Sequence, residues 1–282
     1  MLSTGCSLSN ARSPPLEDKA QSGLQHIPSG GALALHSTRS SIFARGRRDA
    51  QNSSSNAHYQ QAVAAYNAGR FPEAAASFTQ AAHQGHAESQ YILSTMYDAG
   101  KGLPQDDAQA ARWEHQAADQ GHLYAQANFS FRCYTAGDFA GAFEWCRRAA
   151  DGDLAWAQYN LGLMFQKGEG VAPSEAEPRD AEAAHWYRLA AAQGFAEAQQ
   201  RLADLYYLGQ GVPRNYTQAA QWYRRAAEQG NARAQFQLGH LYDVGLGIEH
   251  DYTQYRYWTR KAAEQGHADA IREVMRRDYR DP

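Results

Sequence analysis

Glycine pairs are the first residues in this chain with a spacing that could bind a ligand. G-x-G elements stand at Gly100, Gly168, Gly209 and Gly245. Such glycines cradle phosphates when they follow a strand and open a helix. Here each pair ends one stretch of helical apolar spacing before another begins, and the pair recurs along the chain. We therefore interpret these glycines as turns between helices. The sequence also contains no G-x-x-x-x-G-K-[ST] motif.

The histidines, serines and acids show no spacing typical of catalysis or metal binding. No H-E-x-x-H occurs, and His86, His122 and His267 hold the same turn position in separate parts of the chain, which would keep them apart. No lysine follows a serine at the Ser-x-x-Lys spacing of a serine nucleophile. Paired acids such as Asp106-Asp107 are explained by helix capping. We expect no enzyme, no metal and no cofactor.

The sequence repeats itself at a nearly constant interval. Glycines close equivalent segments at Gly85, Gly121, Gly152, Gly194, Gly230 and Gly266, at intervals of 36, 31, 42, 36 and 36 residues. A period of roughly 20–50 residues is typical of stacked repeat proteins. Such an array offers an extended surface and has no catalytic cleft by default.

The segment 196–231 shows one repeat most clearly. Its first half places Ala198, Leu202 and Leu205 on one helical face, and its second half does the same with Ala219 and Tyr223. Glycines and Pro213 separate the halves. The pattern predicts a helix–turn–helix hairpin that buries its apolar face by stacking on its neighbours.

Three recurring patterns connect these hairpins to a known family: A-x-A-Q-x-x-L-G-x-x-Y, then G-x-G-V, then A-x-x-W-Y-x-x-A-A-x-Q-G. Over roughly residues 57–277 the chain resembles the Sel1-like repeat proteins, a branch of the tetratricopeptide-repeat superfamily. The resemblance implies an all-α solenoid, a right-handed superhelix of about six stacked repeats. It also implies a scaffold for protein–protein interaction. We expect a final capping helix that turns Ile271, Val274 and Met275 to one face.

The first 52 residues differ in composition from the rest. They are rich in Ser, Gly, Pro and Arg and carry six basic and three acidic residues, whereas the whole chain has a net charge of −3. We expect a disordered leader over 1–52 and the repeat domain over 53–282. The small net charge argues against nucleic-acid binding. No stretch approaches the roughly 20 apolar residues of a membrane-spanning helix.

Cys6 lies in a segment with two interpretations. Leu2-Ser3-Thr4-Gly5-Cys6 is similar to the end of a bacterial lipoprotein signal, in which the cysteine becomes lipidated. The apolar stretch that should precede it is absent, although it could lie upstream if Met1 is not the true start. The alternatives are a lipid anchor at Cys6 in the periplasm or outer membrane, and a disordered leader of a protein in the bacterial cytoplasm.

Cys133 and Cys146 occupy positions where other repeats have aromatic residues. The two positions face each other inside one hairpin. Buried thiols are one interpretation. A Cys133–Cys146 disulfide is the other, and it would require an oxidising compartment.

Residues that the repeat pattern leaves free on the first helix of each hairpin are candidates for binding. If these helices line the concave surface, as in tetratricopeptide arrays, the aromatic candidates are Tyr91, Tyr124, Phe131, Tyr134, Trp156, Tyr159, Tyr207 and Phe236. Tyrosine and tryptophan are favoured interface anchors. The alternative is that these rings cover neighbouring repeats.

The resulting expectation is a non-catalytic adaptor of bacterial type that binds a protein or peptide in the concave groove. An exported envelope lipoprotein or virulence-associated protein is a second hypothesis. A hydrolase acting on cell-wall or lactam substrates is a third.

Overall fold

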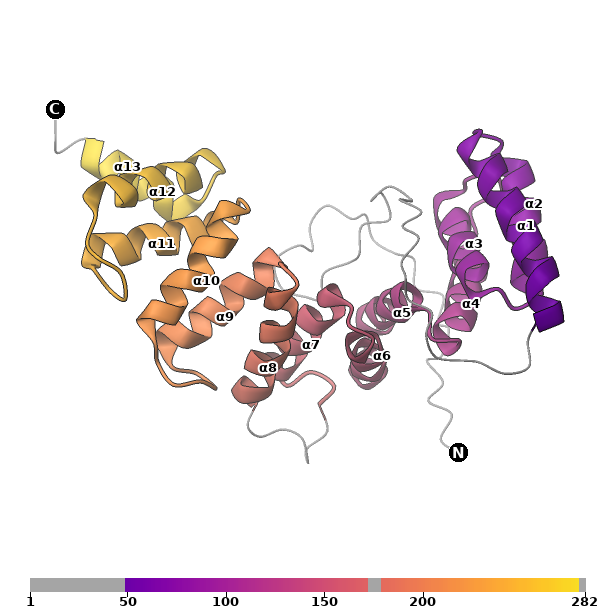
Figure 1. Cartoon of the computed structure of the whole chain (residues 1–282), viewed down its shortest axis with the longest axis horizontal. Coiled ribbons are helices and arrows are strands. Elements are labelled where there is room, and N and C mark those ends of the chain that lie inside the picture. The colour runs from indigo at the N-terminus through magenta and orange to yellow at the C-terminus, as the bar shows by residue number, and fades with distance from the viewer. Residues whose placement is uncertain (1–48, 172–178, 279–282) are drawn as a thin grey trace. The chain divides into compact units, whose positions relative to one another are not determined.

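The computed structural model describes residues 49–171 and 179–278, and all regular elements in these residues are α-helices (Figure 1). They are α1 (Asp49–Asn67), α2 (Phe71–His83), α3 (Ala87–Ala99), α4 (Asp107–Asp119), α5 (Leu123–Thr135), α6 (Phe139–Asp151), α7 (Ala155–Lys167), α8 (Arg179–Ala192), α9 (Ala196–Leu208), α10 (Tyr216–Glu228), α11 (Ala232–Val244), α12 (Tyr252–Glu264) and α13 (Ala268–Asp278). The chain divides after Gly152 into two compact units. We call them unit 1 and unit 2.

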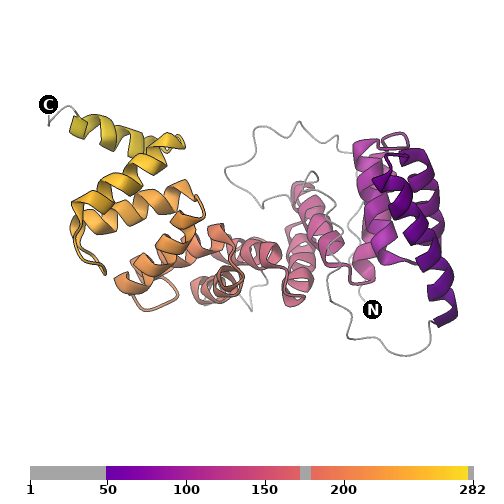
Figure 2. The same ribbon diagram turned by 45° about the horizontal axis from the view of Figure 1, so that its top comes forward.

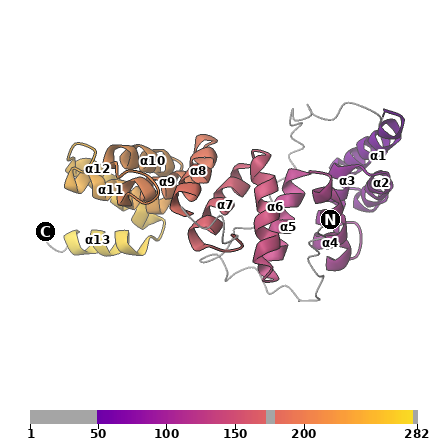
Figure 3. The ribbon, with the colours of Figure 1, turned by 90° about the horizontal axis from the view of Figure 1, so that it is seen from below.

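Each unit is built from antiparallel helix hairpins. Unit 1 contains α1/α2, α3/α4 and α5/α6, and unit 2 contains α7/α8, α9/α10 and α11/α12. Within each unit every helix packs against the next, both inside a hairpin and between hairpins (Figure 2). In unit 2, α13 packs against α12 (Figure 3). This confirms the predicted all-α solenoid of six hairpins and a final helix.

Small alanines allow the helices to approach closely, and a few large side chains fill the space between hairpins. In unit 2, Tyr223 of α10 lies in one core with Leu238 and Leu241 of α11. In unit 1, Phe78 of α2 lies in the corresponding core with Ile92 and Met96 of α3. Each core thus joins the second helix of one hairpin to the first helix of the next.

A ladder of hydrogen bonds between a buried glutamine and an exposed one explains the two glutamines of the repeat pattern. The Gln235 Nε2 atom donates to the Ala227 carbonyl at 3.0 Å, and the Gln265 Nε2 atom donates to the Gln235 Oε1 atom at 2.7 Å. Gln90 with Gln120, and Gln199 with Gln229, repeat the second contact. The ladder therefore ties the start of each first helix to two second helices.

The ladder is interrupted at the end of unit 1. Gly152 stands where other repeats have the donating glutamine, and Asp153, with φ +65, holds the place of their closing glycine, which corrects the alignment of Gly152 with Gly121. The Oε1 atom of Gln126 is buried without a hydrogen-bond partner among the described residues. A Cβ atom on Gly152 would overlap the side chain of Leu123. Other first helices begin with alanine at the place of Leu123. The larger leucine thus fills the space that glycine leaves.

The second glycine of three G-x-G elements is explained by a close contact between backbones. Gly211 has φ +65, and a Cβ atom there would overlap the backbone of Asp180, at the start of the preceding second helix. Gly102 and Gly247 make the equivalent approach to Phe71 and Tyr216. These glycines lie in turns between helices, as interpreted from the sequence, and they also allow neighbouring hairpins to pack closely.

Helix α1 begins at Asp49, slightly before the expected start of the repeat domain at residue 53, and that domain division stays a prediction. On α13, Met275 is 65% exposed, which corrects the expectation that it joins an inward face, whereas Ile271 and Val274 are half-buried. Cys6 lies outside the described residues.

Candidate protein-binding face

An aromatic stack on the first helices of unit 1 contains two of the predicted residues. The Tyr91 ring lies 4.5 Å from the His122 ring at an interplanar angle of 27°, and 6.2 Å from the Tyr124 ring. His122 caps α5, because its Nδ1 atom accepts a hydrogen bond from the Ala125 amide. Tyr124 is 45% exposed. The stack thus presents one exposed ring held in place by its neighbours.

Charged groups continue from this stack toward the next hairpin. The His122 Nε2 atom lies 2.9 Å from the Glu88 Oε2 atom, and this hydrogen bond lowers the pKa of the Glu88 carboxyl. Further along, the Arg132 Nε atom lies 2.5 Å from the Glu114 Oε2 atom, and its Nη2 atom lies 2.8 Å from both Asp98 oxygens. Arg132 is therefore shared between two carboxylates.

Glu114 is the most deeply buried charged group of this network. It is 1% exposed, and burial raises its pKa to about 7 against the opposing effect of Arg132. The Asn128 side chain hydrogen-bonds to both Glu114 and Tyr91. This connects the ion pair to the aromatic stack.

The other two predicted residues of unit 1 lie on the same helix, α5. Phe131 and Tyr134 are both half-buried. The Tyr134 ring packs edge-on against Phe139 of α6, with a centroid distance of 5.1 Å. Part of each ring surface is therefore occupied by its own hairpin.

In unit 2 the predicted aromatic residues pack against neighbouring elements. Trp156 and Tyr159 are buried, at 9% and 4% exposed, and the Tyr159 ring lies 5.2 Å from Phe195. Tyr207 packs edge-on against Tyr216, and Phe236 stacks on His267 at 4.9 Å. These contacts match the alternative of rings that cover neighbours. Trp156 and Tyr159 present too little surface to act as free anchors.

Two arginines and one aspartate lie among these rings on α9 and α11. The Arg201 side chain is hydrogen-bonded to Tyr159. The Asp204 carboxylate accepts a hydrogen bond from the Tyr223 hydroxyl at 2.5 Å and lies 3.5 Å from the Arg233 Nη2 atom. Burial raises the pKa of Asp204. In unit 2 the cationic side chain of Arg201 thus lies near Asp204, an acid whose oxygens already have a hydrogen-bond donor and an ion-pair partner.

The two cysteines of unit 1 are both completely buried, and neither forms a disulfide in the structure. Burial raises the pKa of the Cys146 thiol to about 12. A thiol in this environment is a poor nucleophile at neutral pH, because little thiolate forms. The Cys133–Cys146 disulfide stays a prediction, and counting free thiols in denaturant without reductant would test it.

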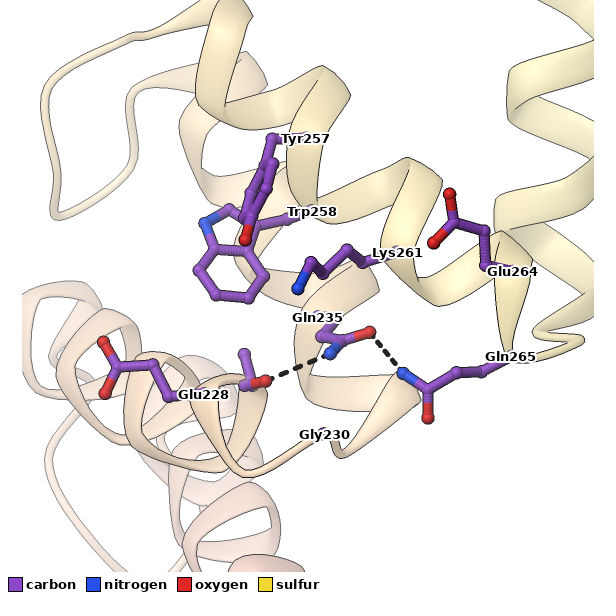
Figure 4. A pocket seen from close by; sticks show the side chains of 9 residues that line it. Glu228, Gly230, Gln235, Tyr257, Trp258, Lys261, Glu264 and Gln265 are labelled. Carbon is purple, nitrogen blue, oxygen red and sulfur yellow. Dashed lines mark hydrogen bonds between the residues drawn. The ribbon is translucent and has the colours of Figure 1, made fainter.

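A shallow pocket lies on the second-helix side of unit 2 (Figure 4). It has a volume of about 430 Å³, and Tyr257, Trp258 and Lys261 of α12 form one side. The Lys261 side chain points into it, and the Lys261 Nζ atom lies 5.1 Å from the Tyr257 ring centroid. The opposite side contains the ladder glutamines Gln235 and Gln265, which are already hydrogen-bonded. The pocket is therefore a gap between successive repeats, and the Gln235–Gln265 hydrogen bond that lines it belongs to the repeat structure.

The described residues contain no arrangement that indicates a metal centre or a bilayer-crossing segment. No three His, Cys, Asp or Glu side chains among them gather as metal ligands. No helix in the described ranges has the length and apolarity needed to cross a membrane.

Sequence reasoning missed the buried Glu114–Arg132 pair and the environment of Arg201. A signal was present for the pair, because Arg132 stands where other first helices have Met96, Met164, Leu205 and Leu241. A charged residue at a core position predicts a compensating partner. For Arg201 the signal was weaker, because the equivalent position holds a core Ile92 in one repeat but Asn128, Asn160 and Gln237 in others.

Comparison with known proteins agrees with this architecture. A family model described as Sel1 repeat matches residues 87–122, 132–154, 157–195, 196–231 and 232–267. Chitin synthase regulatory factor 3 of Schizosaccharomyces pombe is 33% identical over 134 residues, which are 45% of this chain and 14% of that protein. The chain thus spans a small part of that relative.

Two solved structures are also similar. One is c5321, a protective antigen present in uropathogenic Escherichia coli strains displaying an SLR fold, with a TM-score of 0.70 and 34% identity over 79% of this chain and 48% of that chain. The other is a Sel1 repeat protein from Oxalobacter formigenes, with a TM-score of 0.66 and 28% identity over 76% of this chain and 85% of that chain. The matched repeats cover more than half of the sequence. The chain belongs to the Sel1 repeat family.

Proposed function

We propose that this chain is a non-catalytic interaction protein that binds a protein or peptide on its first helices. The observation that carries the proposal is the exposed Tyr124 ring, which is held by the Tyr91–His122 stack and flanked by Glu88. A ring fixed in this way loses little conformational entropy on binding, which favours it as an anchor. Sel1 repeats are helical solenoids of the kind that serve as interaction scaffolds.

The test is a capture experiment with the full chain and paired variants. Tyr124→Ala with Tyr134→Ala removes aromatic surface from α5. Tyr252→Ala with Tyr257→Ala removes two exposed tyrosines from α12, a second helix, and serves as the matched control. We expect the first variant to lose bound proteins that wild type and control retain, with the same helical circular dichroism signal in all three. Equal capture by all three would contradict the proposal.

Trp156 is a poor choice for this experiment. Because it is buried, replacement by alanine would leave a cavity and destabilise unit 2 by roughly 3–5 kcal/mol. A loss of capture could then reflect unfolding. Tyr124 avoids this ambiguity.

The similarity to the E. coli protective antigen favours a second hypothesis on location, an exported protein at the bacterial envelope. Lipidation of Cys6 would place it there. Fractionation of cells that express the intact protein, with Cys6→Ala as the control, tests this idea. Wild-type protein found wholly in the cytosolic fraction would contradict it.

A further inference from the structure

Arg201 of α9 has a positive charge that the Asp204 carboxylate stabilises from a distance, without a direct contact. No carboxylate of the described chain forms an ion pair with it, and its Nε atom is buried without a hydrogen-bond acceptor. Tyr159 supplies a hydrogen bond to the side chain. A guanidinium has five N–H donors, so one hydroxyl leaves donors available for a further acceptor. Burying the Nε donor without an acceptor costs free energy.

The nearby acids Asp204 and Glu197 make no direct contact with the Arg201 guanidinium in the described residues. The Asp204 carboxylate accepts from Tyr223 and from the Gln200 side chain, and it faces Arg233. Glu197 forms no ion pair with Arg201 or Arg233 in the part of the chain that the structure describes. Among the described residues, Arg201 therefore has no carboxylate in direct contact with it.

Packing does not require an arginine at this place either. The equivalent position in other first helices holds Ile92, Asn128, Asn160 and Gln237, which are uncharged. The repeat folds with all of these residues. Arg201 is therefore a feature of this repeat alone, and it lies beside a second arginine, Arg233, whose side chain is 54% exposed.

We propose that Arg201 binds the side-chain carboxylate of an aspartate or glutamate in a peptide segment of a partner, with Arg233 adding a second positive charge. This rests on the proposed function. A guanidinium pairs with a carboxylate through two parallel hydrogen bonds. A singly charged carboxylate suits the site better than a doubly charged phosphate, because Asp204 and Glu197 are close enough to repel additional negative charge. A side chain, unlike a chain terminus, can reach a partly buried guanidinium while the peptide backbone stays outside.

Selection from a random displayed-peptide library tests the proposal with the full chain as bait. Wild type, Arg201→Met, Arg201→Lys and Arg224→Met are compared. Arg224 is an exposed arginine on α10 and serves as the matched control. Synthetic copies of the enriched peptides are then made with an amidated C-terminus, and with glutamate or aspartate replaced by glutamine or asparagine.

We expect enriched peptides to share an acidic residue and to bind Arg201→Met roughly tenfold to a hundredfold more weakly than wild type, as loss of hydrogen bonds to a charged group implies. Arg201→Lys should fall between them, and Arg224→Met should bind like wild type. The glutamine or asparagine peptides should bind wild type and Arg201→Met equally. Unchanged helical circular dichroism and melting temperature show that the variants fold.

Three other outcomes would overturn the inference. If the peptides bind the Arg201 variants as tightly as wild type but bind Tyr124→Ala more weakly, the carboxylate site is wrong and the proposed function still holds. If the peptides lose binding when their C-terminus is amidated, but keep it when their glutamate or aspartate is replaced, Arg201 binds the C-terminal carboxylate of the peptide instead. No enrichment by any bait would contradict both this inference and peptide binding itself.

Discussion

At the scale of single residues, Glu114 and Arg132 replace an apolar pair that other repeats use between hairpins. The corresponding residues are Phe78 with Met96 in unit 1 and Tyr223 with Leu241 in unit 2, and each pair lies in one core. The ion pair therefore lies at a position where other repeats make a hydrophobic contact. Burying two charges costs desolvation energy that their attraction only offsets when both are present.

This substitution leads to a prediction about stability. Arg132→Met leaves the Glu114 carboxylate buried without its cation and should reduce the free energy of unfolding by about 3–5 kcal/mol. Adding Glu114→Phe copies the Phe78–Met96 pair and should recover that loss or exceed it. Urea unfolding of both variants measures the difference. A double variant as unstable as the single one would show that the charges have a role the apolar pair cannot replace.

His86 and His267 predict a pH dependence. Each Nδ1 atom accepts a backbone hydrogen bond that caps the following helix, from Ser89 and Ala270 respectively, so the ring must have that nitrogen unprotonated. Burial lowers the pKa of both histidines below 6.5. In the window below 6.5 the unfolded chain therefore binds more protons than the folded one. The contribution to stability is complete above 6.5 and is lost as the pH falls through the folded pKa.

The repeat itself supplies the variant that tests this dependence. Asn231 occupies the same cap position, and its Oδ1 atom accepts from the Ala234 amide at 2.9 Å. His86→Asn with His267→Asn should keep both caps and reduce the drop in melting temperature between about pH 7.5 and pH 5.5. His185→Asn, at an exposed position on α8, is the control. An unchanged drop in the double variant would refute the assignment.

At the scale of elements, the second glycine of a G-x-G element and the glycine that closes a repeat predict two separable costs. Gly211 combines a positive φ with close backbone contact, whereas Gly230 has a positive φ with open space around it. Gly230→Ala should cost about 1–2 kcal/mol from left-handed strain. Gly211→Ala should cost roughly 1–3 kcal/mol more, because its Cβ atom forces the hairpins apart. Thermal unfolding of both variants gives the difference, and equal losses would show that the close approach is relaxed without cost.

Much at this scale could be predicted from the sequence, and the exceptions have a physical reason. Helices, turns and their pairing follow from residues that recur in register, such as Leu202 and Leu238. The exposure of Tyr159 or Tyr124 does not recur, since it depends on which residue the adjacent repeat places over the ring. Phe195 covers Tyr159, whereas Tyr124 keeps an open face.

At the scale of the whole molecule, stability should be local. The described helices contact chiefly their neighbours in sequence, so a lost contact weakens the hairpins around it and transmits little beyond them. Leu238→Ala removes a fully buried side chain of α11 and should cost about 2–5 kcal/mol. Amide hydrogen exchange should then accelerate in α9–α12 while α1–α4 keep wild-type protection. Phe78→Ala should reverse the pattern, and a uniform loss of protection in either variant would mean that the chain unfolds as one cooperative body rather than as a repeat array.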